Sequence, residues 1–491
     1  AVAGRRGQLL VKNVLATSDV NGAKGLAAGA VGAATASHFD YDALGRLVIV
    51  DGPRTDVTDV TTLEYYSAND ADVGKRGNLA LVTDALGHAT AITAYNAHGQ
   101  PLTIVDPNGR KTKLTYDARQ RLTASDVNGE LSTFAYDDVG QLIEAALPDG
   151  SHVSYAYDDA HRLVSMTDNL GNHVDYTLDL AGNRVKEEVF DAANSLSLER
   201  RRGYDALNRL VSEMGSAGQK TSYTLDAEGN VTAVTDPLGR TATTAYGALN
   251  RAVALTMPKP TVTDPAAVMN KGYDGRSNVA SVSDPRGITT TYTLDAFDRV
   301  RTAVSADAGA VTRTYDAAGN LLSLTDAKGR TTSMTYDAGN RLKTITYEGA
   351  TGAALKTVTI GYDEGTGAIG RLTSTTETAA NGAVLATVAY AYDLMGRLTQ
   401  ESRDQGVKLT TSYEYAPATG LLSLVTYPSG RSLSYTYDAL GRVRAIDTKA
   451  PVSDGGATTT LVANVSYEPF GPVKAFTLGN GLEYVRWAVA R

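Results

Sequence analysis

Apolar and polar residues alternate in short segments that recur along almost the whole chain. In the segment 111–116 the even positions carry Thr, Leu and Tyr, whereas the odd positions carry Lys, Lys and Thr. The segment 432–437 has the same period, with Leu, Tyr and Tyr alternating with Ser, Ser and Thr. A period of two is typical of a β-strand that has one apolar face. The pattern therefore predicts many short strands.

Most repeats carry a tyrosine on the apolar face, typically followed by Asp, two variable residues, Gly, a basic or polar residue, and Leu or Val. The spacing of these anchors is 20 or 21 residues in the best runs, which indicates a repeat array. The anchors are Tyr41, Tyr66, Tyr95, Tyr116, Tyr136, Tyr157, Leu178, Tyr204, Leu225, Tyr246, Tyr273, Leu294, Tyr315, Tyr336, Tyr362, Tyr392, Tyr415, Tyr437 and Tyr467. Because leucine replaces tyrosine three times, we interpret the anchors as core residues and not as a ladder that stacks on ligands.

Two turns are predicted in each repeat, because glycines recur about every ten residues. One is the Tyr-Asp turn, for example Asp137 to Gly140. The other is an Asp-Pro turn, formed by Asp106, Pro107 and Gly109, by Asp236, Pro237 and Gly239, and by Asp284, Pro285 and Gly287. Asp accepts a backbone hydrogen bond, Pro presets φ, and Gly takes the left-handed conformation of a type I turn with a bulge. These are hairpin turns.

A single hairpin cannot bury a core, so neighbouring hairpins must share strands and faces. We expect an all-β fold in which tandem antiparallel β-hairpins form a long curled sheet, a spiral or a hollow β-shell. Residues 1–38 are expected to be a non-repeat N-terminal segment, 39–484 an array of about 19 units, and 485–491 a truncated end, because no capping unit closes the pattern. Insertions that should lengthen hairpins or loops lie at 188–203, 258–272, 346–361, 373–389 and 449–466.

Composition excludes several classes of partner. The 46 basic and 54 acidic residues are interspersed, and the net charge of −8 favours neither nucleic acid nor a membrane surface as a partner. The basic run from Arg200 to Arg202 is predicted to be a solvated loop. There is no cysteine, and no apolar stretch is long enough to span a membrane. The chain begins with Ala, so we expect a signal peptide to have been removed or to be absent.

Residues with catalytic or metal-binding potential are scattered. The six histidines are His38, His88, His98, His152, His161 and His173, which we interpret as exposed strand residues. The cluster Asn69, Asp70 and Asp72 lacks the glycine and distal glutamate of a calcium-binding EF-hand loop. No phosphate-binding loop or nucleophile elbow occurs. The sequence predicts no enzyme, no cofactor, and no catalytic or metal-binding residue.

The blocks at 41–47, 315–321 and 437–443 resemble the YD repeats of the Rhs family. The resemblance extends from about residue 39 to residue 484 and covers bacterial Rhs polymorphic toxins, shell components of insecticidal toxin complexes, wall-associated proteins and teneurins. It implies a hollow β-shell that encloses a toxin or is displayed at the cell surface, with no chemistry performed by the repeats. Toxin members end their shell in a core region with self-cleaving aspartates. This chain stops before such a region, so no protease residue is carried over, and we interpret the Asp-Pro blocks as turns.

The leading hypothesis is a fragment of a bacterial shell, secreted or at the cell surface, that encloses or presents a C-terminal toxin or effector. Its partners would be a polypeptide cargo or the remainder of the same protein, together with a secretion apparatus. One alternative is an adhesion module that binds cell-surface glycans or a protein through the insertions. Another is a truncated remnant that has no independent role.

Overall fold

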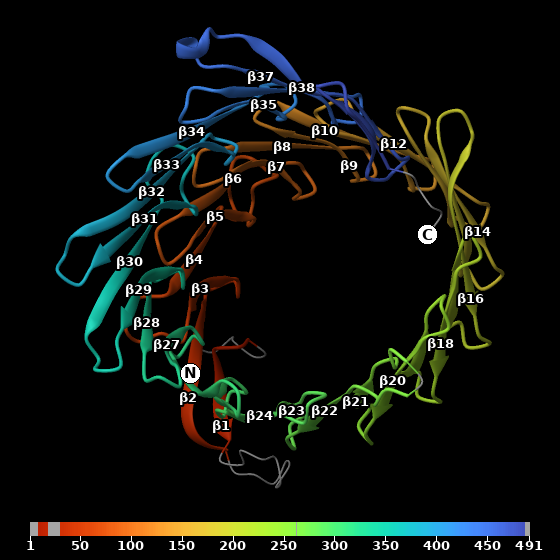
Figure 1. Ribbon diagram of the computed structural model, residues 1–491. Coiled ribbons are helices and arrows are strands. Elements are labelled where there is room, and N and C mark those ends of the chain that lie inside the picture. Colours follow the sequence, from red (N-terminus) through yellow and green to blue (C-terminus); the bar gives the residue numbers. More distant parts are fainter. Residues whose placement is uncertain (1–7, 18–29, 262, 487–491) are drawn as a thin grey trace. The chain divides into compact units, whose positions relative to one another are not determined.

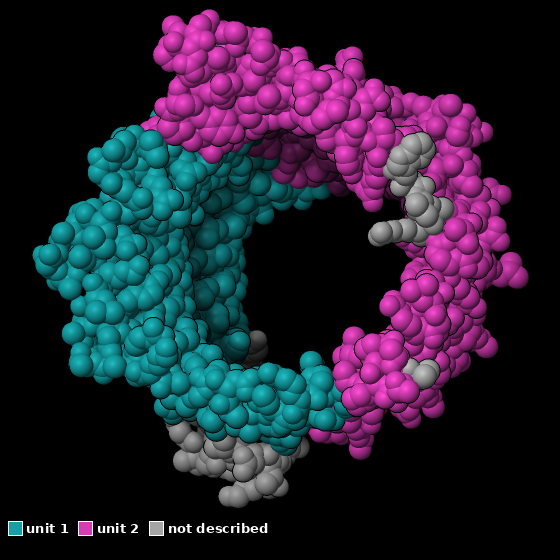
Figure 2. Space-filling view, in the orientation of Figure 1, with its two compact units in different colours: residues 1–112, 268–409 teal, residues 113–267, 410–491 magenta. Residues whose placement is uncertain are grey.

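The computed structural model describes residues 8–17, 30–261 and 263–486 of the 491-residue chain. The described residues form β-strands joined by turns, together with a short 3-10 helix at Val452–Asp454 (Figure 1). The chain divides into two compact units (Figure 2). Unit 1 contains residues 1–112 and 268–409, and unit 2 contains residues 113–267 and 410–491.

Strands of unit 1 are β1 (Val11–Thr17), β2 (Ala30–Tyr41), β3 (Leu47–Asp51), β4 (Val60–Tyr65), β5 (Leu79–Thr83), β6 (Ala89–Tyr95), β7 (Pro101–Val105), β22 (Val268–Tyr273), β23 (Val279–Ser283), β24 (Thr289–Leu294), β25 (Val300–Ser305), β26 (Gly309–Tyr315), β27 (Leu321–Thr325), β28 (Thr331–Tyr336), β29 (Leu342–Glu348), β30 (Ala354–Tyr362), β31 (Leu372–Ala379), β32 (Val384–Tyr392) and β33 (Leu398–Asp404). The chain passes from one unit to the other within β8 (Lys111–Tyr116), between residues 267 and 268, and within β34 (Lys408–Tyr415).

Strands of unit 2 are β9 (Leu122–Val127), β10 (Glu130–Tyr136), β11 (Leu142–Ala146), β12 (His152–Tyr157), β13 (Leu163–Asp168), β14 (His173–Leu178), β15 (Arg184–Phe190), β16 (Leu196–Tyr204), β17 (Leu210–Gly215), β18 (Lys220–Leu225), β19 (Val231–Thr235), β20 (Thr241–Tyr246), β21 (Ala252–Thr256), β35 (Leu422–Thr426), β36 (Ser432–Tyr437), β37 (Val443–Lys449), β38 (Thr458–Tyr467), β39 (Val473–Leu478) and β40 (Glu483–Val485).

Strands that follow one another in sequence pair antiparallel within the units, as β26 does with β27. In that pair Tyr315 lies opposite Leu321, and the register shifts between Thr314 and Tyr315, directly before the turn. Strand β8 alternates exposed and half-buried residues along its length, as the sequence predicts. The prediction of an all-β fold built from tandem antiparallel hairpins is confirmed.

The turn chemistry can be followed at the Asp-Pro turn that begins at Asp236. Its Oδ1 accepts hydrogen bonds from the backbone N–H groups of Leu238 and Arg240, both at 2.9 Å. The N–H of Gly239 donates to the carbonyl of Asp236 at 2.9 Å, and Gly239 has φ +77°. Only glycine takes this conformation without steric cost. Gly109 and Gly287 have φ +80° and +82° at the equivalent positions.

Replacing Gly239 with valine is expected to lower the free energy of unfolding by about 1 kcal/mol or more, because a β-branched side chain is disfavoured at positive φ. An added Cβ would meet no atom within 4 Å, so the cost is one of backbone conformation and not of collision. Urea unfolding followed by circular dichroism measures the effect. The matched control is Leu238→Val, since Leu238 is 77% exposed in the same turn. An equal loss in both variants would contradict the turn geometry.

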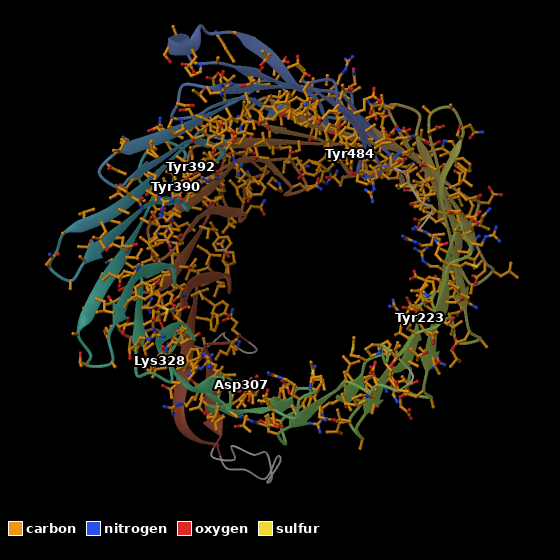
Figure 3. The ribbon with its side chains drawn as sticks, viewed as in Figure 1. Tyr223, Asp307, Lys328, Tyr390, Tyr392 and Tyr484 are labelled. Atoms are coloured by element: carbon orange, nitrogen blue, oxygen red, sulfur yellow. The ribbon has the colours of Figure 1, made fainter. Side chains whose placement is uncertain are left out.

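Few side chains are deeply buried. The buried apolar residues are Tyr95, Val174, Val189, Ala368 and Val425, and no large side chain is less than 2% exposed in the part of the chain described. Tyr390 and Tyr392 are half-buried on the same side of β32 (Figure 3), which is the usual state of the anchors. Because no described helix packs against the strands, the side chains on a face of the sheet are shielded from water mainly by one another. Stability must therefore depend strongly on links between neighbouring repeats.

Several details differ from the sequence interpretation. Strand β4 ends at Tyr65, and the N–H of Tyr66 starts the turn, so Tyr65 holds the anchor position that was assigned to Tyr66. The run Arg200–Arg202 lies in β16 and not in a loop, because the insertion at 188–203 extends the hairpin β15–β16. Insertions at 346–361, 373–389 and 449–466 likewise contain hairpin strands, whereas that at 258–272 contains a loop before β22.

The predicted terminal segments lie partly outside the described residues. Within the N-terminal segment 1–38, β1 pairs antiparallel with β2, and β2 continues into the first anchor, Tyr41. Part of this non-repeat segment is therefore an ordinary part of the sheet. Of the predicted end at 485–491, only residues 485 and 486 are described.

Candidate functional site: turn clamps and seams

In many of the Tyr-Asp turns the Asp and the residue four positions later form a clamp, which is well defined at Asp117. Its Oδ1 accepts the N–H groups of Arg119 and Arg121 at 2.9 Å, and its Oδ2 accepts Nε of Arg121 at 2.7 Å. Nη1 of Arg121 then donates to the carbonyl of Asp137 in the next repeat at 3.0 Å. These hydrogen bonds hold the pKa of Asp117 below its usual range, and the bond from the Arg121 backbone has the largest effect.

The same Asp-Arg clamp recurs in both units. The pairs are Asp42–Arg46, Asp158–Arg162, Asp205–Arg209, Asp295–Arg299, Asp337–Arg341, Asp393–Arg397 and Asp438–Arg442. The guanidinium also lies over a tyrosine ring of the following repeat, at 4.7 Å for Arg121 over Tyr136 and 4.3 Å for Arg341 over Tyr362. In other turns asparagine replaces arginine, and Nδ2 of Asn320 bonds both Asp316 and Asn340 at 2.8 Å.

The anchor tyrosines also join repeats, through their hydroxyl groups. The Tyr315 hydroxyl donates to the carbonyl of Val300 at 3.0 Å, and the Tyr336 hydroxyl to that of Leu321 at 3.0 Å. Each acceptor belongs to the preceding repeat. Equivalent bonds are made by Tyr95, Tyr136, Tyr157, Tyr246, Tyr362, Tyr392, Tyr437 and Tyr467. The anchor position therefore uses the phenol as well as the ring.

Replacing Tyr315 with phenylalanine is expected to cost about 1 kcal/mol of unfolding free energy, because the carbonyl of Val300 loses its donor. Tyr116 provides a matched control, since its hydroxyl donates to no described residue and its ring is half-buried like that of Tyr315. Tyr116→Phe should therefore be close to neutral in the same urea titration. Equal effects at the two positions would show that the hydroxyl bond contributes nothing.

Arg54 joins two segments of unit 1 that are far apart in sequence. Its side chain is 3% exposed and binds Asp56 through Nη2 at 2.6 Å. Nη1 donates to the carbonyl of Asp337, 283 residues away, and to Oδ1 of Asn340 at 3.4 Å. The carboxylate of Asp316 lies 3.8 Å from Nε. These contacts of Arg54, together with the His88–Asp363 and Asn108–Ile369 contacts described next, form what we call the unit 1 seam.

A second seam contact in unit 1 is centred on Asp363. Nε2 of His88 lies 3.2 Å from its Oδ2, and Nδ1 of His88 lies 3.1 Å from Oδ2 of Asp84. Arg341 binds both oxygens of Asp363, at 2.9 and 2.7 Å. Burial opposes ionisation of Asp363, but hydrogen bonds from Arg341 and the Gly370 N–H outweigh it and lower the pKa.

The Asp-Pro turn at Asp106 supplies a third contact. The carboxamide of Asn108 donates to the carbonyl of Ile369 at 3.0 Å and accepts the N–H of Ile369 at 2.8 Å, across 261 residues. In unit 2 the side chain of Asn169 donates to the carbonyl of Ala439 at 2.9 Å, across 270 residues. The hydroxyl of Ser197 donates to Glu468 at 3.1 Å, across 271 residues. We call the Asn169–Ala439 and Ser197–Glu468 contacts the unit 2 seam.

The six histidines are not all exposed strand residues, since His98 and His161 lie in turns. The ring of His173 stacks on Phe190 at 4.8 Å, and His152 lines a cavity. In the loop after β4, Oδ1 of Asp70 accepts the N–H of Asp72, and Oδ1 of Asp72 accepts that of Gly74. Among the described residues no three His, Cys, Asp or Glu side chains are grouped so that they could hold a metal ion. No helix in the described ranges is long and apolar enough to cross a membrane.

Family models match most of the array. The model described as RHS Repeat matches residues 95–131, 136–173, 157–189, 204–241, 226–262, 273–311 and 315–352. The model described as Teneurin YD-shell matches residues 344–454, so that the two together cover more than half of the chain. The chain belongs to the Rhs/YD-repeat family. No curated protein matches it significantly.

Solved structures show the same fold. A crystal structure of TcdB2-TccC3 without its hypervariable C-terminal region is 11% identical, with a TM-score of 0.66 over 92% of this chain and 30% of that one. The Photorhabdus luminescens Tc holotoxin pore is 14% identical, with a TM-score of 0.53 over 90% of this chain and 28% of that one. This chain thus spans less than a third of the length of these proteins. The family and fold neighbours support a shell role for the repeats.

Proposed function

We propose that this chain is a wall segment of a non-catalytic shell that encloses or presents a toxin or effector polypeptide in an exported bacterial protein. The observation that carries the proposal is that two kinds of link, between consecutive repeats and between distant repeats, occur together. Clamps and tyrosine hydroxyls join consecutive repeats, and seams join repeats 261 or more residues apart within each unit. Such cross-linking favours a continuous wall over a string of independent hairpins. The Tc toxin fold neighbours favour a polypeptide cargo.

Protease protection of the complete polypeptide that contains this chain tests the proposal. Proteinase K should leave the array and any enclosed segment intact, and mass spectrometry should identify the protected peptides. An Arg54→Ala variant, which loosens the unit 1 seam, should lose protection of the enclosed segment before it loses that of the repeats. Cleavage of every non-repeat segment at the same rate in both proteins would overturn enclosure.

A second function, as a protein-binding or glycan-binding surface, is favoured by the extended hairpins of unit 1. Leu355, Val384 and Val407 near their turns are 57%, 61% and 70% exposed. Isolated exposed residues are ordinary, but these three lie at or beside the connections β29–β30, β31–β32 and β33–β34, which favours one contact surface. A glycan array and a cell-binding assay separate the two functions, because a passive wall segment should give no signal in either. Binding that is lost when the three residues are changed to serine would favour adhesion.

A further inference from the structure

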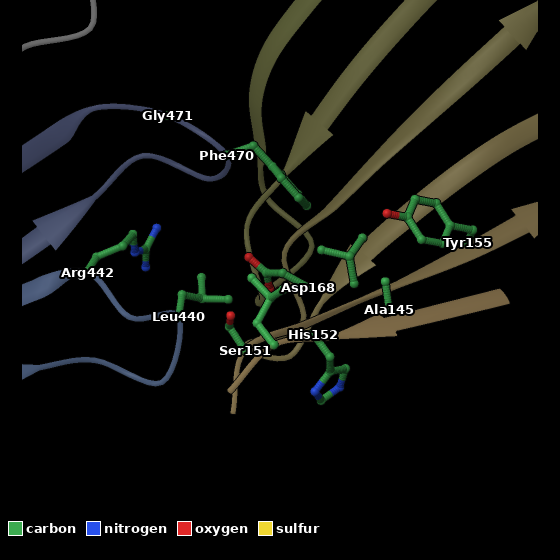
Figure 4. A pocket seen from close by; sticks show the side chains of 11 residues that line it. Ala145, Ser151, His152, Tyr155, Asp168, Leu440, Arg442, Phe470 and Gly471 are labelled. Carbon is green, nitrogen blue, oxygen red and sulfur yellow. The ribbon is translucent and has the colours of Figure 1, made fainter. Parts of the chain in front are cut away.

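A cavity of about 410 Å³ lies beside the unit 2 seam (Figure 4). Its walls come from two parts of the unit, residues 145–168 and residues 440–471. The apolar wall residues are Ala145, Leu147, Val153, Tyr155, Leu440 and Phe470. A concave, mainly apolar site with a few polar groups at its edge is the usual form of a ligand pocket, and this volume lies within the usual range.

Phe470 is held in an unfavourable backbone conformation beside the cavity. The N–H of Gly471 donates to the carbonyl of Glu468 at 3.0 Å, so Phe470 occupies the third position of the turn, where its φ is +49°. Glycine suits this position, and a bulky residue there costs about 1 kcal/mol or more. Phe470 is 40% exposed, and its ring points toward the cavity (Figure 4). Burial does not compensate for the strain, and strained residues gather at ligand clamps.

Arg442 gives the cavity a cationic edge. Its Nε and Nη2 bind Asp438 at 2.8 Å, and its guanidinium lies 4.4 Å from the ring centre of Tyr467. At Arg121 and Arg299 the remaining nitrogen, Nη1, donates to a carbonyl of the following turn. Nη1 of Arg442 donates to no described residue. One donor of this clamp is therefore available to a ligand.

The acidic residue of the cavity does not need a ligand. Asp168 is 5% exposed, and its Oδ1 accepts the N–H groups of Leu170 and Asn172 at 3.0 and 2.9 Å. Its Oδ2 accepts Nδ2 of Asn172 at 2.8 Å. The oxygens of Asp168 are therefore occupied, and the hydrogen-bonding group left without a described partner at the edge is Nη1 of Arg442, whose charge is paired with Asp438. The cavity thus suits an apolar ring that is accompanied by a carboxylate.

We propose that the cavity binds an aromatic side chain next to a Glu or Asp residue on a polypeptide segment. The ring would lie between Phe470 and the apolar wall, and the carboxylate would accept a hydrogen bond from Nη1 of Arg442. This inference deepens the proposed function, and it rests on that function for the source of the segment. A polypeptide cargo supplies aromatic and acidic residues in adjacent positions, whereas a neutral glycan supplies no carboxylate.

Peptide titration of the complete chain tests the site. The probe is acetyl-Ala-Trp-Glu-Ala-amide, compared with peptides in which Trp is replaced by Ala or Glu by Gln, and binding is measured by saturation-transfer NMR and calorimetry. Loss of the ring should weaken binding at least about tenfold, and loss of the charge about three- to tenfold. Absence of binding by the Trp-Glu peptide at millimolar concentration would overturn the proposal, as would equal binding of all three peptides.

Two variants separate binding from folding. Phe470→Gly relieves the positive φ, so its melting temperature should be unchanged or higher, while its affinity for the Trp-Glu peptide falls about tenfold or more. Arg442→Gln should weaken binding of the Glu peptide and leave that of the Gln peptide unchanged. The control is Leu207→Gly, a 69% exposed residue at the third position of a turn outside the cavity. Full affinity in Phe470→Gly would refute the site even if protease protection showed an enclosed cargo.

Discussion

Arg54→Ala is expected to lower the free energy of unfolding of unit 1 by about 2–4 kcal/mol. The side chain is 3% exposed, and its removal leaves the Asp337 carbonyl and the Asp316 carboxylate without their cationic partner. Asp316 is itself only 10% exposed in its side chain, so water cannot replace the guanidinium fully. Asp56, at 62% exposure, can be rehydrated, which keeps the expected loss below that of a fully buried pair.

Hydrogen exchange locates the Arg54 effect as well as measuring it. Amides of residues 336–340 should exchange faster in the variant, although they lie 282 to 286 residues from the substitution. Arg240→Ala is the control, because among the described residues the Arg240 side chain binds only the Asp236 of its own turn, and it is 61% exposed. Its effect should be much smaller and confined to that turn. Equal effects of the two substitutions would show that the unit 1 seam does not stabilise the unit.

Acidification is expected to unfold the array over a narrow range below about pH 4. Many of the turn aspartates have pKa values held below their usual range by hydrogen bonds, for example from the Arg121 backbone at Asp117 and the Arg240 side chain at Asp236. A carboxyl with a lowered pKa in the folded state contributes stability that is present above its unfolded pKa. That contribution is lost as the pH falls through the folded pKa.

The loss should be steep, because many clamps release together. Lowered values occur at Asp42, Asp117, Asp158, Asp179, Asp205, Asp226, Asp236, Asp274, Asp284, Asp295, Asp326, Asp363 and Asp438. Melting temperatures from circular dichroism between pH 2.5 and 8 measure the effect, and the aspartates should contribute no slope between pH 5 and 8. A melting temperature that stays constant down to pH 3 would contradict a stabilising role for the ionised clamps.

Individual residues show why the repeat was predictable and its links were not. Asp106 and Gly109 were identified as turn residues because the hydrogen bonds of a tight turn join groups within four positions. The position after the glycine was recognised only as basic or polar, although its recurrence signals the clamp that Arg121 forms. The sequence pattern misplaces Arg200–Arg202 in a loop because this strand carries charges on both faces, with Arg202 paired to Glu187 and Arg201 to Glu199, and so has no apolar alternation.

The sequence by itself determined the family, the antiparallel hairpins and the chemistry of their turns, because all three depend on residues close together and repeated many times. The tertiary structure decided the seams and the cavity. Arg54 meets Asp337 across 283 residues, and Asn169 meets Ala439 across 270. Neither contact is repeated from one hairpin to the next, so the periodic pattern of the sequence does not predict it. The contact also depends on the twist accumulated over many strands, which no single repeat encodes.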